Sequence, residues 1–149
     1  MRLYLIQHGK YMPEEEAPGK PLSQEGREET EKIANFLKSR DITPDIILHS
    51  KKRRAIETAQ ILSQFLNVEA KERDDLNPTD PVEKFPAEIL KTGKDVMIVG
   101  HLPFLQKLVS LLLTGKDDNE IISFIYSGLV CLGFEKSWQV KWFITPDLT

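Results

Sequence analysis

The sequence has little of three things, and each shortage excludes a class of protein. It contains one cysteine, Cys131, so no disulfide can form within the chain. No apolar run approaches the about 18 residues of a membrane-spanning helix, and no basic segment followed by an apolar stretch opens the chain as in a signal peptide. The 20 basic residues do not outnumber the 23 acidic ones, which disfavours a binder of nucleic acid or of a membrane surface. We therefore expect a cytoplasmic protein with no nucleic-acid or membrane partner.

The composition is that of an ordinary globular protein. Hydrophobic residues make up 40% of the 149 residues and charged residues 29%. The length matches one domain of roughly 100–200 residues, and no repeat, low-complexity segment or linker divides it, so we expect a single domain over residues 1–149. Cys131 lies in the apolar run LVCLGF. It is expected to be a buried hydrophobic residue and not a nucleophile.

Short apolar runs alternate with helical patterns along the chain. Continuous apolar runs of this kind are typical of strands covered on both faces, as in a parallel sheet, and they are Leu3–Ile6, Ile46–Leu48 and Val96–Val99. Apolar residues at helical spacing predict four helices, at about Gln24–Ser39 with Ser23 as N-cap, Lys52–Leu66, Pro81–Thr92 and Pro103–Leu113.

The last part of the chain predicts two strands joined by a short turn, Leu129–Phe134 and Trp138–Ile144. Trp138 and Trp142 are four residues apart, which places both on one face of a regular strand, where we expect them to pack and not to recognise a ligand. Strands alternating with helices predict an α/β fold. The expected architecture is a three-layer sandwich with a mostly parallel central sheet and helices on both faces.

Each of the first three apolar runs ends in residues that can take part in phosphate or proton chemistry. They are Gln7, His8 and Gly9 after the first run, His49, Ser50 and the basic cluster Lys51–Arg54 after the second, and Gly100 and His101 after the third. Ligands of open α/β sheets bind beyond the carboxyl ends of the strands, so we expect two histidines and an arginine that are far apart in the sequence to converge there. Four cations at a helix N-terminus are unfavourable for the helix, and a phosphate ligand would offset that cost.

In this order and spacing, the motifs resemble those of the histidine phosphatase superfamily, the group with an Arg-His-Gly signature that includes phosphoglycerate mutases and acid phosphatases. The motifs are His8-Gly9, Pro21-Leu22-Ser23 with Gly26, Ser50 with Arg54-Ala55 and Thr58, and Val99-Gly100-His101-Leu102-Pro103. The small size and the Gly-His-Leu-Pro form of the second histidine are most similar to its phosphohistidine phosphatase branch, the SixA type. The resemblance covers residues 1 to about 110, and the C-terminal strands more loosely, and it implies a phosphoglycerate mutase-like fold.

The resemblance implies catalytic roles for three side chains. His8 would be the nucleophile that accepts a phosphoryl group, Arg54 would clamp the phosphoryl oxygens, and a protonated His101 would donate to the oxygens where charge builds up. Gly9 would let the backbone approach the phosphate closely. No metal or other cofactor is implied, and the sequence shows no His/Cys/Asp cluster with the spacing of metal ligands.

Gln7 departs from the signature, which has arginine at this place. Glutamine can donate two N–H bonds to a phosphoryl oxygen but carries no charge, and hydrogen bonds from ionised donors are about twice as strong as neutral ones. Lys10 is the natural candidate to supply the missing charge. Asp75 is a possible general acid, although the Asp and Asn residues of the segment Asp74–Pro78 are more typical of an ordinary turn.

The short loops Tyr11–Leu22 and Arg73–Pro86 favour a protein substrate, because a small sugar phosphate needs enclosing contacts. The expected partner is a phosphohistidine-bearing protein such as a histidine phosphotransfer domain, which Lys51–Arg54 could steer. Its imidazole leaving group protonates near neutral pH by itself. Three alternatives remain open: a phosphatase of a small phosphomonoester, which needs an acid such as Asp75; a catalytically weakened phosphate- or phosphoprotein-binding module, because of Gln7; and a nucleic-acid binder.

Overall fold

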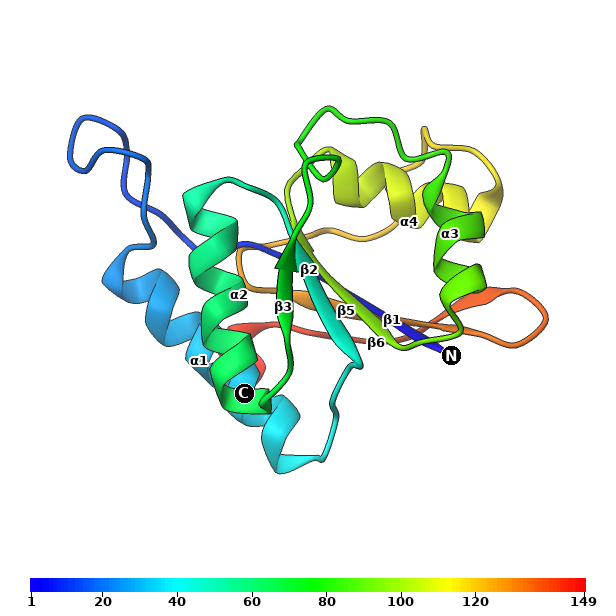
Figure 1. Cartoon of the computed structure of the whole chain (residues 1–149), viewed down its shortest axis with the longest axis horizontal. Helices are drawn as coiled ribbons and strands as arrows, with labels where there is room; N and C mark the ends of the chain where they lie inside the picture. Colours follow the sequence, from blue (N-terminus) through cyan, green and yellow to red (C-terminus); the bar gives the residue numbers. More distant parts are fainter.

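The computed structural model describes residues 1–149 and is a three-layer α/β structure, with a six-stranded sheet between two pairs of helices (Figure 1). The strands are β1 (Arg2–Gln7), β2 (Ile46–His49), β3 (Ala70–Glu72), β4 (Val96–Gly100), β5 (Leu129–Phe134) and β6 (Trp138–Ile144). The helices are α1 (Gln24–Ser39), α2 (Arg53–Leu66), α3 (Phe85–Thr92) and α4 (Phe104–Thr114), followed by the 3-10 helix η1 (Pro146–Leu148).

The sheet has the strand order β3-β2-β4-β1-β5-β6. The first four strands in this order run parallel, whereas β5 pairs antiparallel with β1 and with β6. The expected mostly parallel sheet with helices on both faces is therefore confirmed. The carboxyl ends of β1, β2 and β4 lie at one edge of the sheet, and the amino end of the antiparallel β5 lies at the same edge.

Each face of the sheet carries its own hydrophobic core. Under α1 and α2, side chains such as Ile33 and Leu62 pack with Ile6 from the sheet. Under α3 and α4, Phe104 packs with Leu5 and other side chains of the opposite face. Strands that alternate between two cores must be apolar at every position, which explains the continuous apolar runs of β1 and β4.

The start of α3 differs from the sequence prediction, which began the helix at Pro81. The carboxylate of Asp80 accepts hydrogen bonds from the backbone N–H and the side-chain amide of Asn77, 2.8 Å each, and holds the chain in a turn. The helix begins only at Phe85, with Pro86 in its first turn, where a missing N–H costs no hydrogen bond. The other three predicted helices agree within one residue at each end, and Ser23 caps α1 by accepting the N–H of Gly26.

The prediction that Trp138 and Trp142 share a face is wrong, because β6 contains a bulge. Cys131 pairs with Trp142 while Leu132 pairs with Val140, so one residue of β6 has no partner and the alternation of side chains is reversed beyond it. Trp138 consequently packs in the core under α3 and α4, and Trp142 packs against the core under α1 and α2. Their expected packing role is confirmed.

Cys131 is buried, as expected, and burial raises the pKa of its thiol to about 11. The thiol is therefore protonated at neutral pH and is a poor nucleophile. None of the helices combines the length and the apolar character that crossing a membrane requires.

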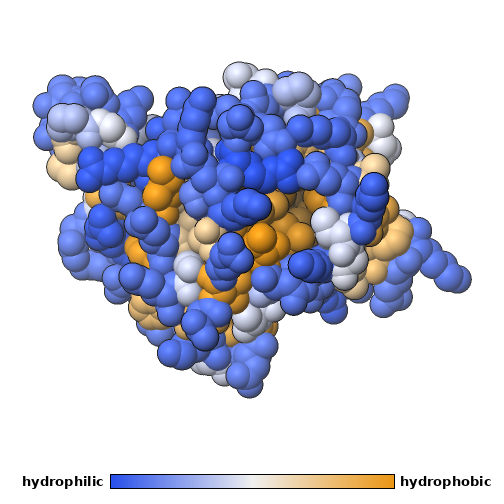
Figure 2. Space-filling model, in the orientation of Figure 1, coloured by the Kyte–Doolittle hydropathy of each residue, from blue (hydrophilic) through white to orange (hydrophobic).

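The face shown in Figure 2 is mostly hydrophilic, with apolar side chains gathered near its centre over β2. A hollow of about 550 Å³ lies between β2, β3 and the end of α3, lined by Ile46, Leu48, Lys71, Arg73, Thr92, Lys94 and Val96. None of these residues belongs to the group that the sequence singles out at the strand ends.

The start of α1 presses against the backbone that follows His8. The backbone N–H of Ser23 donates to the carbonyl of Lys10 (3.0 Å), and a Cβ atom on Gly26 would lie only 2.1 Å from the oxygen of that carbonyl. Gly26 is thus the residue that lets the helix and the segment after His8 approach each other.

We expect Gly26→Ala to lower the free energy of unfolding by about 2 kcal/mol, the range of an overpacked core site. A decrease would be informative, because replacing glycine by alanine within a helix normally raises the free energy of unfolding by up to about 1 kcal/mol. Urea unfolding measures the change, with Glu31→Ala at an exposed position of the same helix as the control. A Gly26→Ala variant as stable as the control would contradict the close approach.

Candidate active site

The residues expected to converge do meet at the carboxyl edge of the sheet. The rings of His8, after β1, and His101, after β4, have their centroids 4.9 Å apart. Thr58 links α2 to the segment that follows β1. Its Oγ1 accepts the N–H of Gly9 (3.0 Å) and donates to the carbonyl of Arg54 (2.8 Å). The first turn of α2, which carries Arg54, is thereby held next to His8.

The tautomer of His8 follows from its hydrogen bond. Its Nδ1 lies 2.9 Å from the carbonyl oxygen of Gly9, which can only accept, so Nδ1 carries the proton. Burial, helped by the nearby Arg54 guanidinium, lowers the pKa of His8 to about 4. At neutral pH the ring is therefore uncharged and Nε2 has a free lone pair, the form in which imidazole is a nucleophile.

His101 is held by Ser50. The backbone N–H of Lys52 donates to Oγ of Ser50 (3.3 Å), and the only acceptor for the hydroxyl hydrogen of Ser50 is Nε2 of His101, at 2.6 Å. Nδ1 of His101 therefore carries the proton, and it is buried without a partner. It is a donor available to a ligand.

The charge of His101 differs from what the family resemblance implied. Burial first, and then the neighbouring His8, Arg54 and Lys52, lower the pKa of His101 to about 3, so the ring is neutral at pH 7. Its neutral Nδ1–H can still donate to an oxygen, and a nearby phosphoryl anion would move the pKa of His101 upward.

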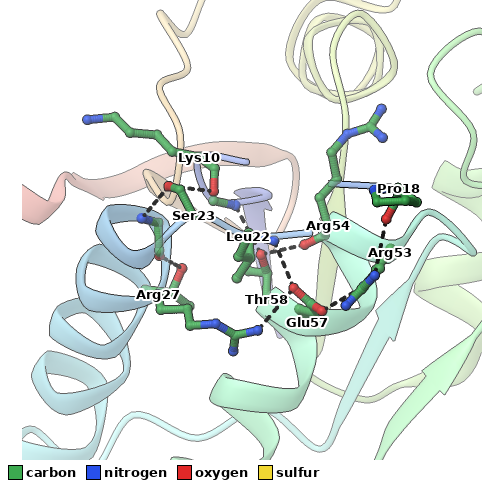
Figure 3. A network of polar contacts seen from close by, with 12 residues as sticks. Lys10, Pro18, Leu22, Ser23, Arg27, Arg53, Arg54, Glu57 and Thr58 are labelled. Carbon is green, nitrogen blue, oxygen red and sulfur yellow. Dashed lines mark hydrogen bonds and ion pairs between the residues drawn. The ribbon is translucent and has the colours of Figure 1, made fainter. Parts of the chain in front are cut away.

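Arg54 has no counter-ion in the protein. Its guanidinium forms no ion pair or hydrogen bond with another residue, its Nε is buried without a partner, and its Cζ lies 5.0 Å from the centre of the Tyr11 ring. The adjacent Arg53, in contrast, is paired with Glu57 (3.0 Å) and donates to the carbonyl of Pro18. Figure 3 shows Arg54 pointing away from this network, so its charge is available to an anion.

Glu57 holds the loop between β1 and α1 against α2. Its carboxylate accepts the backbone N–H of Leu22 (2.8 Å) and pairs with Arg27 and Arg53 (Figure 3). The two ends of the loop are joined by a bridge between Tyr11 and Leu22. These contacts fix the position of Tyr11 beside His8.

Lys10, expected to replace the missing arginine, is directed elsewhere. Its Nζ pairs with Glu25 (2.7 Å) and Glu29 (3.4 Å) of α1, and the hydrogen bond to Glu25 raises the pKa of Lys10. In Figure 3 the side chain extends away from Arg54. Its charge is already matched by carboxylates.

Asp75 does not suit the role of general acid. Arg73 and Lys84 both pair with its carboxylate, at 2.6 and 2.7 Å, and the hydrogen bonds from Arg73 are the main cause that lowers its pKa to about 2. A carboxyl group with this pKa is ionised near neutrality and has no proton to donate. The charged groups that shift the pKa values of His8 and His101 include no carboxylate.

Gln7 and Gly9 both lie in tightly packed surroundings. Gln7 is buried, and its Oε1 has no hydrogen-bond partner. A Cβ atom on Gly9 would come within 3.0 Å of Thr30 Oγ1 and 3.1 Å of the carbonyl oxygen of Gly26. The absence of a side chain at Gly9 is thus required by α1, which packs against it.

Sequence reasoning missed two aromatic residues at this site. The rings of Tyr11 and Tyr126 have their centroids 5.4 and 5.6 Å from that of His8, and 6.1 Å from each other. The antiparallel direction of β5 was the available signal, since the residues before such a strand reach the edge where the parallel strands end. No three His, Cys, Asp or Glu side chains lie together as a metal site would need.

Known proteins resemble the chain in sequence and in fold. The family model described as Histidine phosphatase superfamily (branch 1) matches residues 3–81. The structure of the protein histidine phosphatase SixA in complex with tungstate superposes with a TM-score of 0.88, at 23% identity over 100% of both chains. A protein from Agrobacterium tumefaciens described as a SixA phosphohistidine phosphatase superposes with a TM-score of 0.78, at 26% identity over 97% of both chains. A protein from Escherichia coli described as an alpha-ribazole-5'-P phosphatase superposes with a TM-score of 0.82, at 17% identity over 98% of both chains. No curated protein matches the chain.

We expect ¹⁵N NMR to find His8 and His101 neutral and protonated on Nδ1, and titrating only as the pH falls through about 4 and about 3. The protein has three histidines, so single His→Asn variants assign the signals. At about pH 6, an unperturbed histidine would already be mostly protonated. A charged His8 at that pH, or one protonated on Nε2, would contradict the hydrogen-bond pattern.

Proposed function

The chain belongs to branch 1 of the histidine phosphatase superfamily, and from this premise we propose that it hydrolyses phosphohistidine on a protein through a phosphoryl group carried by His8. One observation carries the proposal: a neutral His8 with a free Nε2 lone pair stands beside an Arg54 guanidinium that has no counter-ion. Transfer of a phosphoryl anion needs both a nucleophile and a positioned positive charge.

In the first step, Nε2 of His8 attacks the phosphorus atom of the substrate. A P–N bond to His8 forms while the P–N bond to the substrate ring breaks, and the electron pair of the broken bond stays on the substrate nitrogen. The substrate ring leaves as neutral imidazole when its other nitrogen carries a proton, which is common near neutral pH. Arg54 holds the phosphoryl oxygens, and Nδ1–H of His101 donates to one of them.

In the second step, water attacks the phosphorus atom of phospho-His8. The P–N bond to His8 breaks, its electron pair returns to Nε2, inorganic phosphate leaves, and the surplus proton of the water passes to solvent. The carbonyl of Gly9 keeps the proton on Nδ1 of His8 throughout. The ring therefore returns to the nucleophilic tautomer with no rearrangement.

The groups near the histidines favour phosphohistidine over a phosphomonoester. An alkoxide leaving group needs an acid, whereas Asp75 is ionised and no carboxylate contributes to the pKa of His8 or His101. Imidazole leaves without such help. The names of the SixA proteins whose fold the chain shares point to the same substrate class.

Gln7 is the reason to keep a second candidate, a phosphoprotein-binding module with little turnover. It brings no charge to a site where Lys10 is paired with Glu25 and Glu29, so Arg54 is the cation whose charge shifts the pKa of His8. Neutral donors hold phosphate less strongly than charged ones. Binding without release of phosphate would be the sign of this module, and Gln7→Arg should then raise turnover.

We expect the wild-type protein to release phosphate from a histidine phosphotransfer domain phosphorylated with phosphoramidate, and to carry acid-labile, base-stable phosphate itself. His8→Ala should lose both signals, because the other imidazole near Arg54, that of His101, has its Nε2 lone pair engaged by the hydroxyl of Ser50 and its Nδ1 protonated. His49→Asn is the matched control: His49 is also buried at a strand end and also donates from Nδ1 to the next carbonyl, that of Ser50. Phosphate release that survives in His8→Ala would exclude the covalent route.

The same assay separates the candidates. Turnover of p-nitrophenyl phosphate without turnover of the phosphorylated domain would point to a small phosphomonoester. Vanadate binding without any phosphate release would point to the binding module.

We expect Arg54→Lys to lower kcat/KM by about 100-fold, because lysine keeps the charge but cannot bond two phosphoryl oxygens with a planar fork. The control is Arg53→Lys, at the next position of the same helix, where the side chain is exposed and pairs with Glu57. Its kcat/KM should change by less than about threefold. Equal losses in the two variants would mean that Arg54 acts only through the general positive charge of the cluster.

A further inference from the structure

Half of the exposed large hydrophobic side chains of the protein lie in one short segment, which ends at Tyr126 beside the candidate active site. They number six, at Leu90, Ile121, Ile125, Tyr126, Val140 and Leu148. Three of the six belong to one short segment, Ile121–Tyr126, in which Ile121 and Ile125 are each 42% exposed and Tyr126 is 37% exposed. Apolar side chains gathered in this way on a surface are typical of a protein-binding site.

We propose that the segment Ile121–Tyr126 is the surface on which the substrate protein docks. Apolar side chains next to its phosphohistidine would cover Ile121 and Ile125, while the phosphorylated ring would lie against Tyr11 and Tyr126. This docking role rests on the proposed function and adds to it the surface that selects a protein over a free phosphorylated amino acid.

The segment is anchored, so the exposure of its apolar residues is built into the fold. Phe124 is buried in the core under α3 and α4, and Ile122 packs against the same core. Beyond the segment, the backbone N–H of Ser127 donates to the carbonyl of Gln7 (2.9 Å) at the end of β1. Because these contacts fix the segment on the core and on β1, the side chains of Ile121 and Ile125 stay exposed to solvent.

The segment is also continuous with the site of the chemistry. The ring centroid of His8 lies 5.6 Å from that of Tyr126 and 5.4 Å from that of Tyr11, and the centroids of the two tyrosine rings are 6.1 Å apart. A hollow of about 420 Å³ lies beside the two tyrosines and is lined by Lys10, Tyr11, Pro13, Ser23, Glu25 and Tyr126. Ring pairs at these distances are in the favourable range for aromatic contact, so a second imidazole brought to His8 would meet an aromatic wall.

The size of the surface decides between a protein and a small molecule as its occupant. A free phosphohistidine can contact Tyr126 while its phosphoryl group is at His8, but it has no atoms with which to cover the isoleucine side chains farther along the segment. Covering an exposed isoleucine with apolar atoms of a partner stabilises the complex, because apolar surface is removed from water. Only a partner that extends beyond the phosphorylated residue obtains this gain.

The test compares two substrates, a histidine phosphotransfer domain phosphorylated with phosphoramidate and free phosphohistidine. We expect Ile121→Ser and Ile125→Ser each to lower the ratio of the two kcat/KM values, protein over free amino acid, by about fivefold or more, as for the loss of an apolar anchor. The control is Val140→Ser on β6, where the side chain has the same exposed fraction, 42%, but lies outside the segment. Its ratio should stay within about twofold of the wild type.

An unchanged ratio in both isoleucine variants, or an equal fall in Val140→Ser, would overturn the docking surface while leaving the proposed function intact. A wild-type protein that hydrolyses neither substrate would overturn the proposed function and the docking surface together. All variants should unfold within a few degrees of the wild type, since the substituted side chains are exposed.

Discussion

The hydrogen bond from Nδ1 of His8 to the carbonyl of Gly9 determines what the rest of the site can do. Because a carbonyl only accepts, this bond leaves Nε2 as the nitrogen with a free lone pair. The bond depends in turn on the backbone after β1, which turns under α1 where Gly26 leaves room for the carbonyl of Lys10. His8, the two glycines and the start of α1 therefore form one unit.

Electrostatics make this unit suitable for an anion. The two histidines are buried and neutral, and the guanidinium of Arg54 has no carboxylate beside it. The protein as a whole carries a net charge of −3, yet its nearby carboxylates are engaged with other cations, Glu57 with Arg27 and Arg53, and Glu25 with Lys10. An uncompensated positive charge in a partly dehydrated site attracts a phosphoryl group more strongly than the same charge in open solvent.

The sequence predicted well those features that depend on neighbouring residues. The strand runs, the cap at Ser23, the end of α3 at Thr92 and the two C-terminal strands could be predicted because local pattern and backbone preference decide them. It was less reliable where a side chain chooses among partners distant in the sequence. Lys10 and Asp75 were assigned to the site by their position and charge. In the structure, Lys10 forms ion pairs with Glu25 and Glu29. Asp75 forms ion pairs with Arg73 and Lys84. The bulge that places Trp138 and Trp142 on opposite faces depends on the pairing of β5 with β6, and the sequence pattern of either strand alone does not indicate it.

By itself, the sequence determined the α/β class, the sheet with helices on both faces, and the expectation that His8, Arg54 and His101 meet, because parallel strands bring their carboxyl ends to one edge whatever the details of packing. Only the tertiary structure decided which nitrogen of His8 is free, that His101 is neutral, that Arg54 has no counter-ion, and that Tyr11 and Tyr126 line the site. The physical reason is that tautomer, pKa and ion pairing depend on distances of a few ångströms between groups far apart in the chain. Those distances are set by how α1, α2 and the segment before β5 pack on the sheet.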